Sequence, residues 1–91
     1  MVAKPLPSTQ FNLFSMYYVY VIRNKVTKET YIGFSNDLRR RFKEHKRKTP
    51  ELLYYEAYKG EKDARDRERK LKQRGQTLRW LKERIKVSLR E

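Results

Sequence analysis

The sequence contains no cysteine and only one histidine among its 91 residues. Without cysteine, no disulfide can staple the chain and no thiolate can hold a metal ion. A lone histidine also excludes a metal centre built from several histidines. Any bound metal ion would therefore be held mainly by oxygen atoms, which favours magnesium, manganese or calcium.

The sequence also lacks long apolar runs. None approaches the roughly 20 apolar residues of a membrane-spanning helix. Residues 1–15 carry Lys4, Pro5 and Pro7 and lack the apolar stretch of a secretory signal. We therefore expect a soluble, cytoplasmic protein with no membrane partner. Residues 1–15 are interpreted as a flexible leader, and residues 16–91 as one domain, because the chain is too short for two hydrophobic cores.

Positive charge is what the sequence has in excess. Lysine and arginine number 24 against 11 acidic residues, which gives a formal net charge of +13. Such an excess attracts polyanions, of which DNA and RNA are the obvious candidates. Aromatic residues make up 13% of the chain, whereas disordered basic tails have few of them. We therefore expect a folded domain with a small core and a cationic surface.

Three segments rich in aromatic and β-branched residues predict strands at residues 17–22, 30–33 and 52–58. The first is apolar at odd and even positions alike, which is typical of a central strand covered on both faces. A polar turn at residues 24–28 predicts that the first two strands form an antiparallel hairpin.

Three helices are predicted at about residues 36–47, 62–74 and 77–89. Ser35 or Asn36 is a suitable N-cap for the first helix, and Gly75 a suitable residue just after the second. The fold class is therefore α/β of the α+β type, in the order β-β-α-β-α-α, with a three-stranded antiparallel sheet flanked by three helices.

The first predicted helix places Arg41 and His45 on the same face as Leu38 and Phe42. A guanidinium held at the edge of the core could clamp a phosphate through two hydrogen bonds. Alternatively, Arg41 could extend past Phe42 into solvent. His45 could carry protons or could be a packed histidine bonded to a carbonyl group.

Glu68 occupies a position on the second helix where the pattern set by Ala64 and Leu71 calls for an apolar residue. A carboxylate turned toward the sheet needs a partner, because its burial alone is costly. A divalent cation is one candidate partner. Surface salt bridges with the neighbouring arginines are the other.

The tyrosines of the predicted hairpin carry a resemblance. Tyr18-Val19-Tyr20, followed after ten residues by Tyr31-Ile32-Gly33, resembles the paired tripeptides that name the GIY-YIG nucleases. Residues 31–45 are similar to the family's second motif and the helix that carries its arginine. Residues 64–72 resemble its glutamate-bearing helix. The chain resembles most the small stand-alone members, although Tyr18 and Val19 stand where the family has glycine and isoleucine.

The resemblance implies the GIY-YIG nuclease fold and a metal-dependent endonuclease that hydrolyses DNA phosphodiester bonds. It also implies a role for each matching position. Two tyrosines line the active site, and one of them is the general base or part of the relay that activates water. An arginine contacts the scissile phosphate, and a histidine assists proton transfer. A glutamate is the single acidic ligand of one Mg²⁺ or Mn²⁺ ion, and a glycine lets the backbone pass close to the site. In this chain these are Tyr20, Tyr31, Arg41, His45, Glu68 and Gly33.

Basic side chains on the first two helices are expected to contact the phosphate backbone, which gives affinity with little sequence choice. They are Arg39, Arg40, Lys43, Arg65, Arg69 and Lys72. We expect structure-selective or weakly sequence-specific cleavage in repair or recombination, with branched or damaged DNA as candidate substrates. No small-molecule cofactor is expected, and the chain is expected to be a monomer or weak dimer.

Two other functions fit the composition. One is a catalytically inactive nucleic-acid-binding module on the same fold, which basic charge alone supports equally well. A carboxylate that faces a cationic site argues against it, because phosphate binding has no use for that group. The other is a basic protein that binds an anionic membrane surface.

Overall fold

The computed structural model describes residues 16–45 and 49–91. The elements follow in the order β1 (Tyr17–Asn24), β2 (Thr30–Ser35), α1 (Leu38–Glu44), β3 (Pro50–Tyr58), α2 (Glu61–Lys72), α3 (Gln76–Arg84) and α4 (Lys86–Arg90). The predicted β-β-α-β-α-α order is confirmed, with the last predicted helix divided in two. The leader predicted at residues 1–15 and the predicted end of the first helix at residues 46–47 lie outside the described residues.

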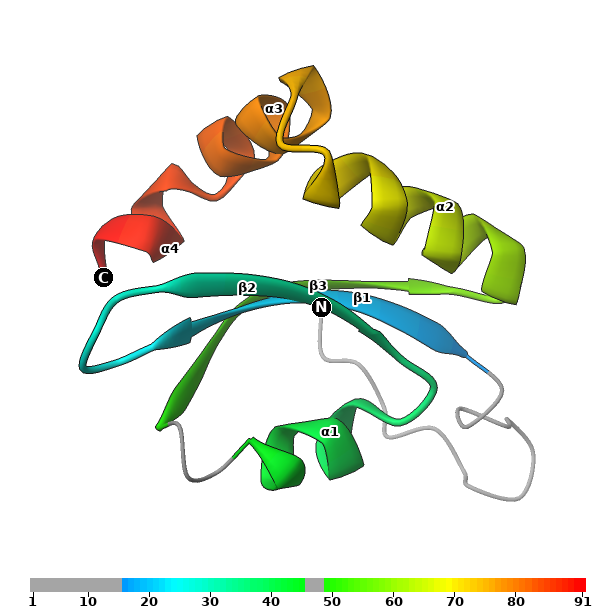
Figure 1. Ribbon diagram of the computed structural model, residues 1–91, viewed down its shortest axis with the longest axis horizontal. Coiled ribbons are helices and arrows are strands. Elements are labelled where there is room, and N and C mark those ends of the chain that lie inside the picture. The colour runs from blue at the N-terminus through cyan, green and yellow to red at the C-terminus, as the bar shows by residue number, and fades with distance from the viewer. Residues whose placement is uncertain (1–15, 46–48) are drawn as a thin grey trace, which may run out of the picture.

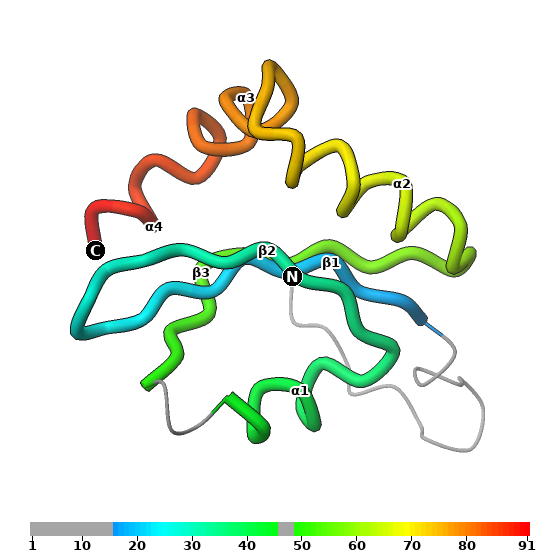
Figure 2. The backbone as a smooth tube through the Cα atoms, in the orientation of Figure 1, coloured from blue at the N-terminus to red at the C-terminus, as the bar shows by residue number. Residues whose placement is uncertain are grey.

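The three strands form one antiparallel sheet in the order β2-β1-β3. Figure 2 traces the backbone through the strands and helices. The central position of β1 explains why it is apolar at odd and even positions. The register places Tyr20 of β1 opposite Gly33 of β2 and Tyr55 of β3. Strands β2 and β3 are therefore the edge strands, each paired with β1 on one side.

The helices lie on both faces of the sheet. Figure 1 shows α1 on one face and α2, α3 and α4 on the other. Within the described ranges, no helix combines the length and apolarity that crossing a bilayer requires.

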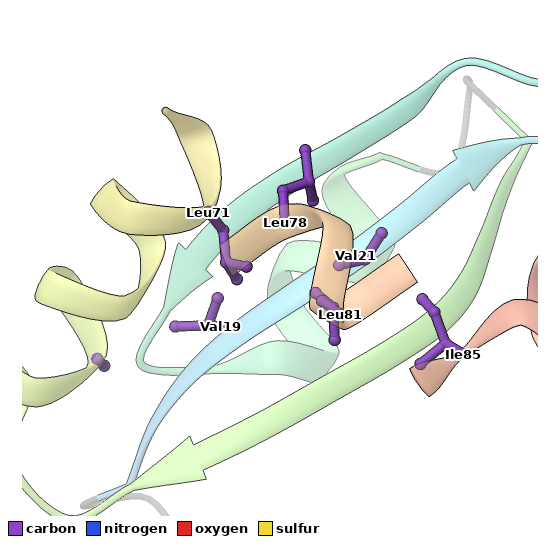
Figure 3. Packing of buried hydrophobic residues seen from close by; sticks show 7 residues of the cluster. Val19, Val21, Leu71, Leu78, Leu81 and Ile85 are labelled. Atoms are coloured by element: carbon purple, nitrogen blue, oxygen red, sulfur yellow. The ribbon is translucent and has the colours of Figure 1, made fainter. Parts of the chain in front are cut away.

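The hydrophobic core lies between the sheet and the layer formed by α2 and α3. Alternate residues of β1, Val19 and Val21, point toward this layer, as Figure 3 shows. Their partners are the apolar stripes of the helices: Ala64, Leu71, Leu78, Leu81 and Ile85. Burial of each large aliphatic side chain contributes about 1.5–3 kcal/mol. This core therefore holds α2 in a defined position against the sheet.

Two helix boundaries differ from those predicted. The N-cap of α1 is Asp37, whose side chain accepts a hydrogen bond from the backbone N–H of Arg40 at 3.1 Å. Ser35 instead binds the backbone of Asp37. After α2, Arg74 and not Gly75 takes the left-handed conformation, with φ 56°. Gly75 is the N-cap of α3.

The predicted third helix breaks at Ile85, whose φ and ψ are −108° and 24°. Ile85 is buried in the core, and the break turns the chain toward the sheet. There Arg23 Nη1 of β1 donates a hydrogen bond to the backbone oxygen of Leu89 at 2.6 Å. Because this arginine satisfies a carbonyl group at the end of α4, it ties the last helix to the central strand.

Candidate active site

The predicted site residues line one hollow of about 320 Å³ at the free edge of β2, here called the β2 hollow. Six of its lining residues are the positions that the sequence singled out: Tyr20, Tyr31, Gly33, Arg41, His45 and Glu68. The structure thus brings together side chains from two strands and two helices that are separated along the chain.

The fold explains this convergence. Arg41 comes from the middle of α1 and His45 from its C-cap, on one face of the sheet, and Glu68 comes from α2 on the other. Both layers contribute residues to the β2 hollow, beside β2, which is an edge strand of the sheet. The edge position of β2 therefore allows an arginine and a glutamate from opposite faces to share the wall of one hollow.

Gly33 leaves the space that the ring of Tyr20 occupies. The two residues are cross-strand partners, so their side chains would project on the same face. A Cβ atom at Gly33 would overlap the hydroxyl group and ring of Tyr20. The sequence predicted a strand that ends at Gly33. In the structure β2 continues to Ser35, so this boundary was wrong. The close approach expected there is the approach of this ring.

Tyr20 is almost fully buried, with 6% of its surface exposed. Burial raises the pKa of its hydroxyl group, Arg41 lowers it, and Glu68 raises it again, with a net rise above the usual value. The phenol is therefore protonated at neutral pH. Arg41 and Glu68 both affect the pKa of Tyr20, which agrees with the position of all three groups on the wall of the β2 hollow.

Tyr31 differs from Tyr20 in environment. It is 43% exposed, and its hydroxyl group donates a hydrogen bond to Glu29 Oε2 at 2.5 Å. This hydrogen bond raises the pKa of Tyr31. A hydroxyl group that donates to a carboxylate is poorly placed to accept a proton from water. The two tyrosines are therefore not equivalent, and Tyr20 is the better placed for chemistry.

Arg41 has both a surface partner and an unused donor. Its Nη1 atom lies 3.7 Å from Glu44 Oε1. Its Nε atom is buried and has no hydrogen-bond partner within the part of the chain that the structure describes. A buried donor without an acceptor costs about 1–3 kcal/mol. An anion in the β2 hollow would supply an acceptor to this guanidinium.

His45 is the C-cap of α1, and its backbone N–H bonds to the oxygen of Arg41. The helix face predicted to carry both residues together with Leu38 and Phe42 is divided in the structure. Arg41 and His45 line the β2 hollow, whereas Leu38 and Phe42 line an apolar hollow of about 440 Å³ beside Leu52.

Glu68 is only 18% exposed, and its Oε2 atom lies 3.0 Å from Lys72 Nζ one turn along α2. Among the described residues, no three His, Cys, Asp or Glu side chains gather as a metal site. One carboxylate on the wall of a hollow of about 320 Å³ fits magnesium or manganese, because such ions keep several waters and bind substrate phosphates. The donor set thus fits one ion at Glu68.

The basic residues predicted to contact DNA divide into three groups. Lys72 lines the β2 hollow, and Arg40 and Arg65 line a neighbouring hollow that also includes Arg41 and Glu68. The others lie apart from these two hollows. Arg39 and Lys43 border the apolar hollow on α1, and Arg69 pairs with Asp66 on the surface of α2.

Arg23 lines the β2 hollow and was not predicted as a site residue. It is 6% exposed, and its guanidinium is held by Glu51 and by the backbone oxygen of Leu89. The alternation of β1 contains the signal, because Arg23 has the same parity as Val19 and Val21. A charged residue on the buried face of a strand needs specific partners.

The chain was also compared with known proteins. A family model described as the GIY-YIG catalytic domain matches residues 16–84, which is most of the chain and includes every element from β1 to α3. No curated protein and no solved structure gives a significant match.

Proposed function

The chain belongs to the GIY-YIG family of nucleases, and we propose that it hydrolyses DNA phosphodiester bonds in the β2 hollow with one Mg²⁺ or Mn²⁺ ion. The observation that carries the proposal is the presence of Arg41 and Glu68 on the wall of one hollow. A surface that only binds phosphate gains nothing from a carboxylate there, because like charges repel.

Glu68 is the residue that would hold the ion. Its low exposure and its position at the hollow favour a cation beside the bound phosphate. When bound, such an ion supplies positive charge that stabilises the phosphate and the leaving oxygen. Lys72 neutralises the same carboxylate and would move to the DNA backbone when the ion is held.

Arg41 stabilises the charge that develops on the phosphate. Arg41 lines the β2 hollow, and the terminal nitrogen atoms of its guanidinium are donors that suit a phosphate oxygen there. Preorganised donors of this kind contribute about 10²–10³ in rate. Because α1 anchors the arginine through its backbone, the guanidinium stays near the hollow before DNA binds.

Tyr20 orients the attacking water by hydrogen bonding. Its raised pKa argues for a neutral phenol that positions water and passes a proton on, and against a standing phenolate. His45 lines the same hollow and is the candidate for assisting proton transfer. Tyr31 forms part of the wall of the β2 hollow, and its hydroxyl group donates a hydrogen bond to Glu29.

We propose structure-selective or weakly sequence-specific cleavage, with branched or damaged DNA as substrate in repair or recombination. The basic helices support backbone contacts, which carry little sequence information. Among the described residues, the sheet packs against α2 and α3 around one hydrophobic core.

The test is nicking of supercoiled and branched DNA with and without Mg²⁺, with Glu68→Ala as the matched variant. We expect the wild type to cut only with the metal ion, and Glu68→Ala to bind DNA without cutting it. If the wild type binds DNA but never cuts it, and Glu68→Ala binds equally well or better, the chain is a binding module. Binding to anionic vesicles that survives excess DNA would instead indicate a membrane-surface protein.

A further inference from the structure

A second hollow of about 380 Å³ adjoins the β2 hollow, and is here called the flanking hollow. Three arginines line it, Arg40, Arg41 and Arg65, together with Phe34, Ser35, Asn36 and Glu68. Arg41 and Glu68 belong to both hollows. The two hollows are therefore neighbours that share one wall.

Arg65 is held in place by two contacts of different kinds. Its guanidinium carbon lies 4.1 Å from the ring centroid of Phe34, and its Nε atom donates to Glu61 Oε2 at 2.8 Å. Stacking uses the flat face of the guanidinium, so its edge can still donate hydrogen bonds within the plane. This geometry suits an anion with several oxygen atoms.

Arg40 approaches from α1. Its Nη2 atom donates to Asn36 Oδ1 at 3.2 Å, which orients the guanidinium along the loop that precedes the helix. Arg40 and Arg65 thus come from helices on opposite faces of the sheet and line one hollow. Among the described residues that line the hollow, Glu68 is the one carboxylate, and it is paired with Lys72 at 3.0 Å. Glu61 and Glu44 pair with Arg65 and Arg41, so the cationic groups still outnumber the carboxylates around the hollow.

We propose that the flanking hollow binds the backbone phosphate next to the one held by Arg41, with Arg65 and Arg40 as its ligands. This proposal rests on the proposed function for the identity of the polyanion. The alternative for these arginines is surface salt bridges. However, Arg65 stacks on Phe34, and the flanking hollow shares a wall with the β2 hollow. Both features favour a binding site, because surface ion pairs form without stacking and without a neighbouring hollow. A second fixed phosphate would set the path of the strand through the β2 hollow.

The experiment uses a branched duplex in which single phosphates are replaced with neutral methylphosphonates. The branch point gives the protein one binding position on the DNA, so each replaced phosphate has a fixed location relative to the protein. Binding is measured by fluorescence anisotropy with EDTA, so that no cutting occurs. One replacement should weaken wild-type binding about fivefold, the size typical of a partly exposed ion pair. Arg65→Gln should weaken binding by a similar factor and be insensitive to that same replacement. Arg41→Gln should be insensitive to the replacement one phosphate away.

Arg79→Gln is the matched control. It removes the same charge from α3, where Arg79 donates to Gln76 Oε1 on the exposed surface. This variant should keep the wild-type pattern of sensitivity. Arg40→Gln should behave as Arg65→Gln does.

Two outcomes would overturn the proposal. In the first, Arg65→Gln keeps the full sensitivity of the wild type at every phosphate, as Arg79→Gln is expected to do. In the second, the phosphates assigned to Arg65 and Arg41 are not neighbours. Because binding is measured without metal, the assignment can succeed even if the protein never cuts DNA, so the two proposals can fail separately.

Discussion

Replacement of Gly33 by alanine tests the packing that shapes the β2 hollow. The backbone of Gly33 does not have a positive φ, so alanine fits the local conformation, and only the new Cβ atom is at issue. That atom would overlap the hydroxyl group and ring of Tyr20. Tyr20 is 6% exposed, so its ring can yield only by moving within the hollow.

The size of the effect follows from two opposing contributions. Overpacking of a buried side chain costs about 1–3 kcal/mol. The lower entropy of the unfolded chain returns up to about 1 kcal/mol when glycine becomes alanine. We therefore expect Gly33→Ala to lower the free energy of unfolding by about 1–2 kcal/mol. Displacement of the Tyr20 hydroxyl group should also slow DNA cleavage under conditions in which the variant is still fully folded.

Urea unfolding followed by circular dichroism measures the stability change. In a Tyr20→Ala background the clash is absent, so the same glycine change should no longer destabilise the fold and should raise the free energy of unfolding by up to about 1 kcal/mol. Gly75→Ala is the control, because nothing lies within 4 Å of the added atom. If Gly33→Ala is as stable as the wild type, or equally destabilising without the Tyr20 ring, the packing argument is wrong.

Two further predictions concern groups that anchor the helices. Burial would raise the pKa of Glu56, but hydrogen bonds from Arg67, Tyr54 and Tyr58 lower it overall, below the ordinary 4.5. This group therefore stabilises the fold fully above pH 4.5, and the contribution is lost as the pH falls through the lower folded value. Urea unfolding between pH 2 and 7, about the titration range of a carboxyl group, should show this loss for the wild type and a flatter profile for Glu56→Gln; parallel profiles would contradict it. Arg23→Met should lower the free energy of unfolding by about 2–3 kcal/mol, because it leaves Glu51 and the Leu89 oxygen without their donor. Hydrogen exchange should then be faster in α4, and unchanged exchange there would refute the anchoring role.

Much of the fold could be predicted from local sequence. Each strand lies where aromatic and β-branched residues cluster, and each helix follows the spacing of its apolar residues, because both patterns reflect which side is buried. The helix ends were less predictable. The left-handed residue is Arg74 and not Gly75, and the break at Ile85 depends on tertiary contacts of the last turn that no local pattern records.

The candidate site shows the same division. The helical spacing of apolar residues is enough to point to Arg41 and Glu68, because each departs from what its helix face requires. Their meeting at one edge of the sheet depends on the strand order β2-β1-β3, which single segments do not encode. The flanking hollow was harder to predict from the sequence, because the contact between Arg65 and Phe34 joins a helix to a strand 31 positions away.

The most direct test of the central claim is single-turnover cleavage of branched DNA by Arg41→Gln, Glu68→Gln and the double variant, with DNA affinity measured in parallel. If both groups act on one phosphate, each single change should slow cleavage by about 10²–10³ while binding persists. The double variant should then be little slower than either single variant, because residues that act as a unit are not additive. Cleavage at the wild-type rate by either single variant would contradict the account.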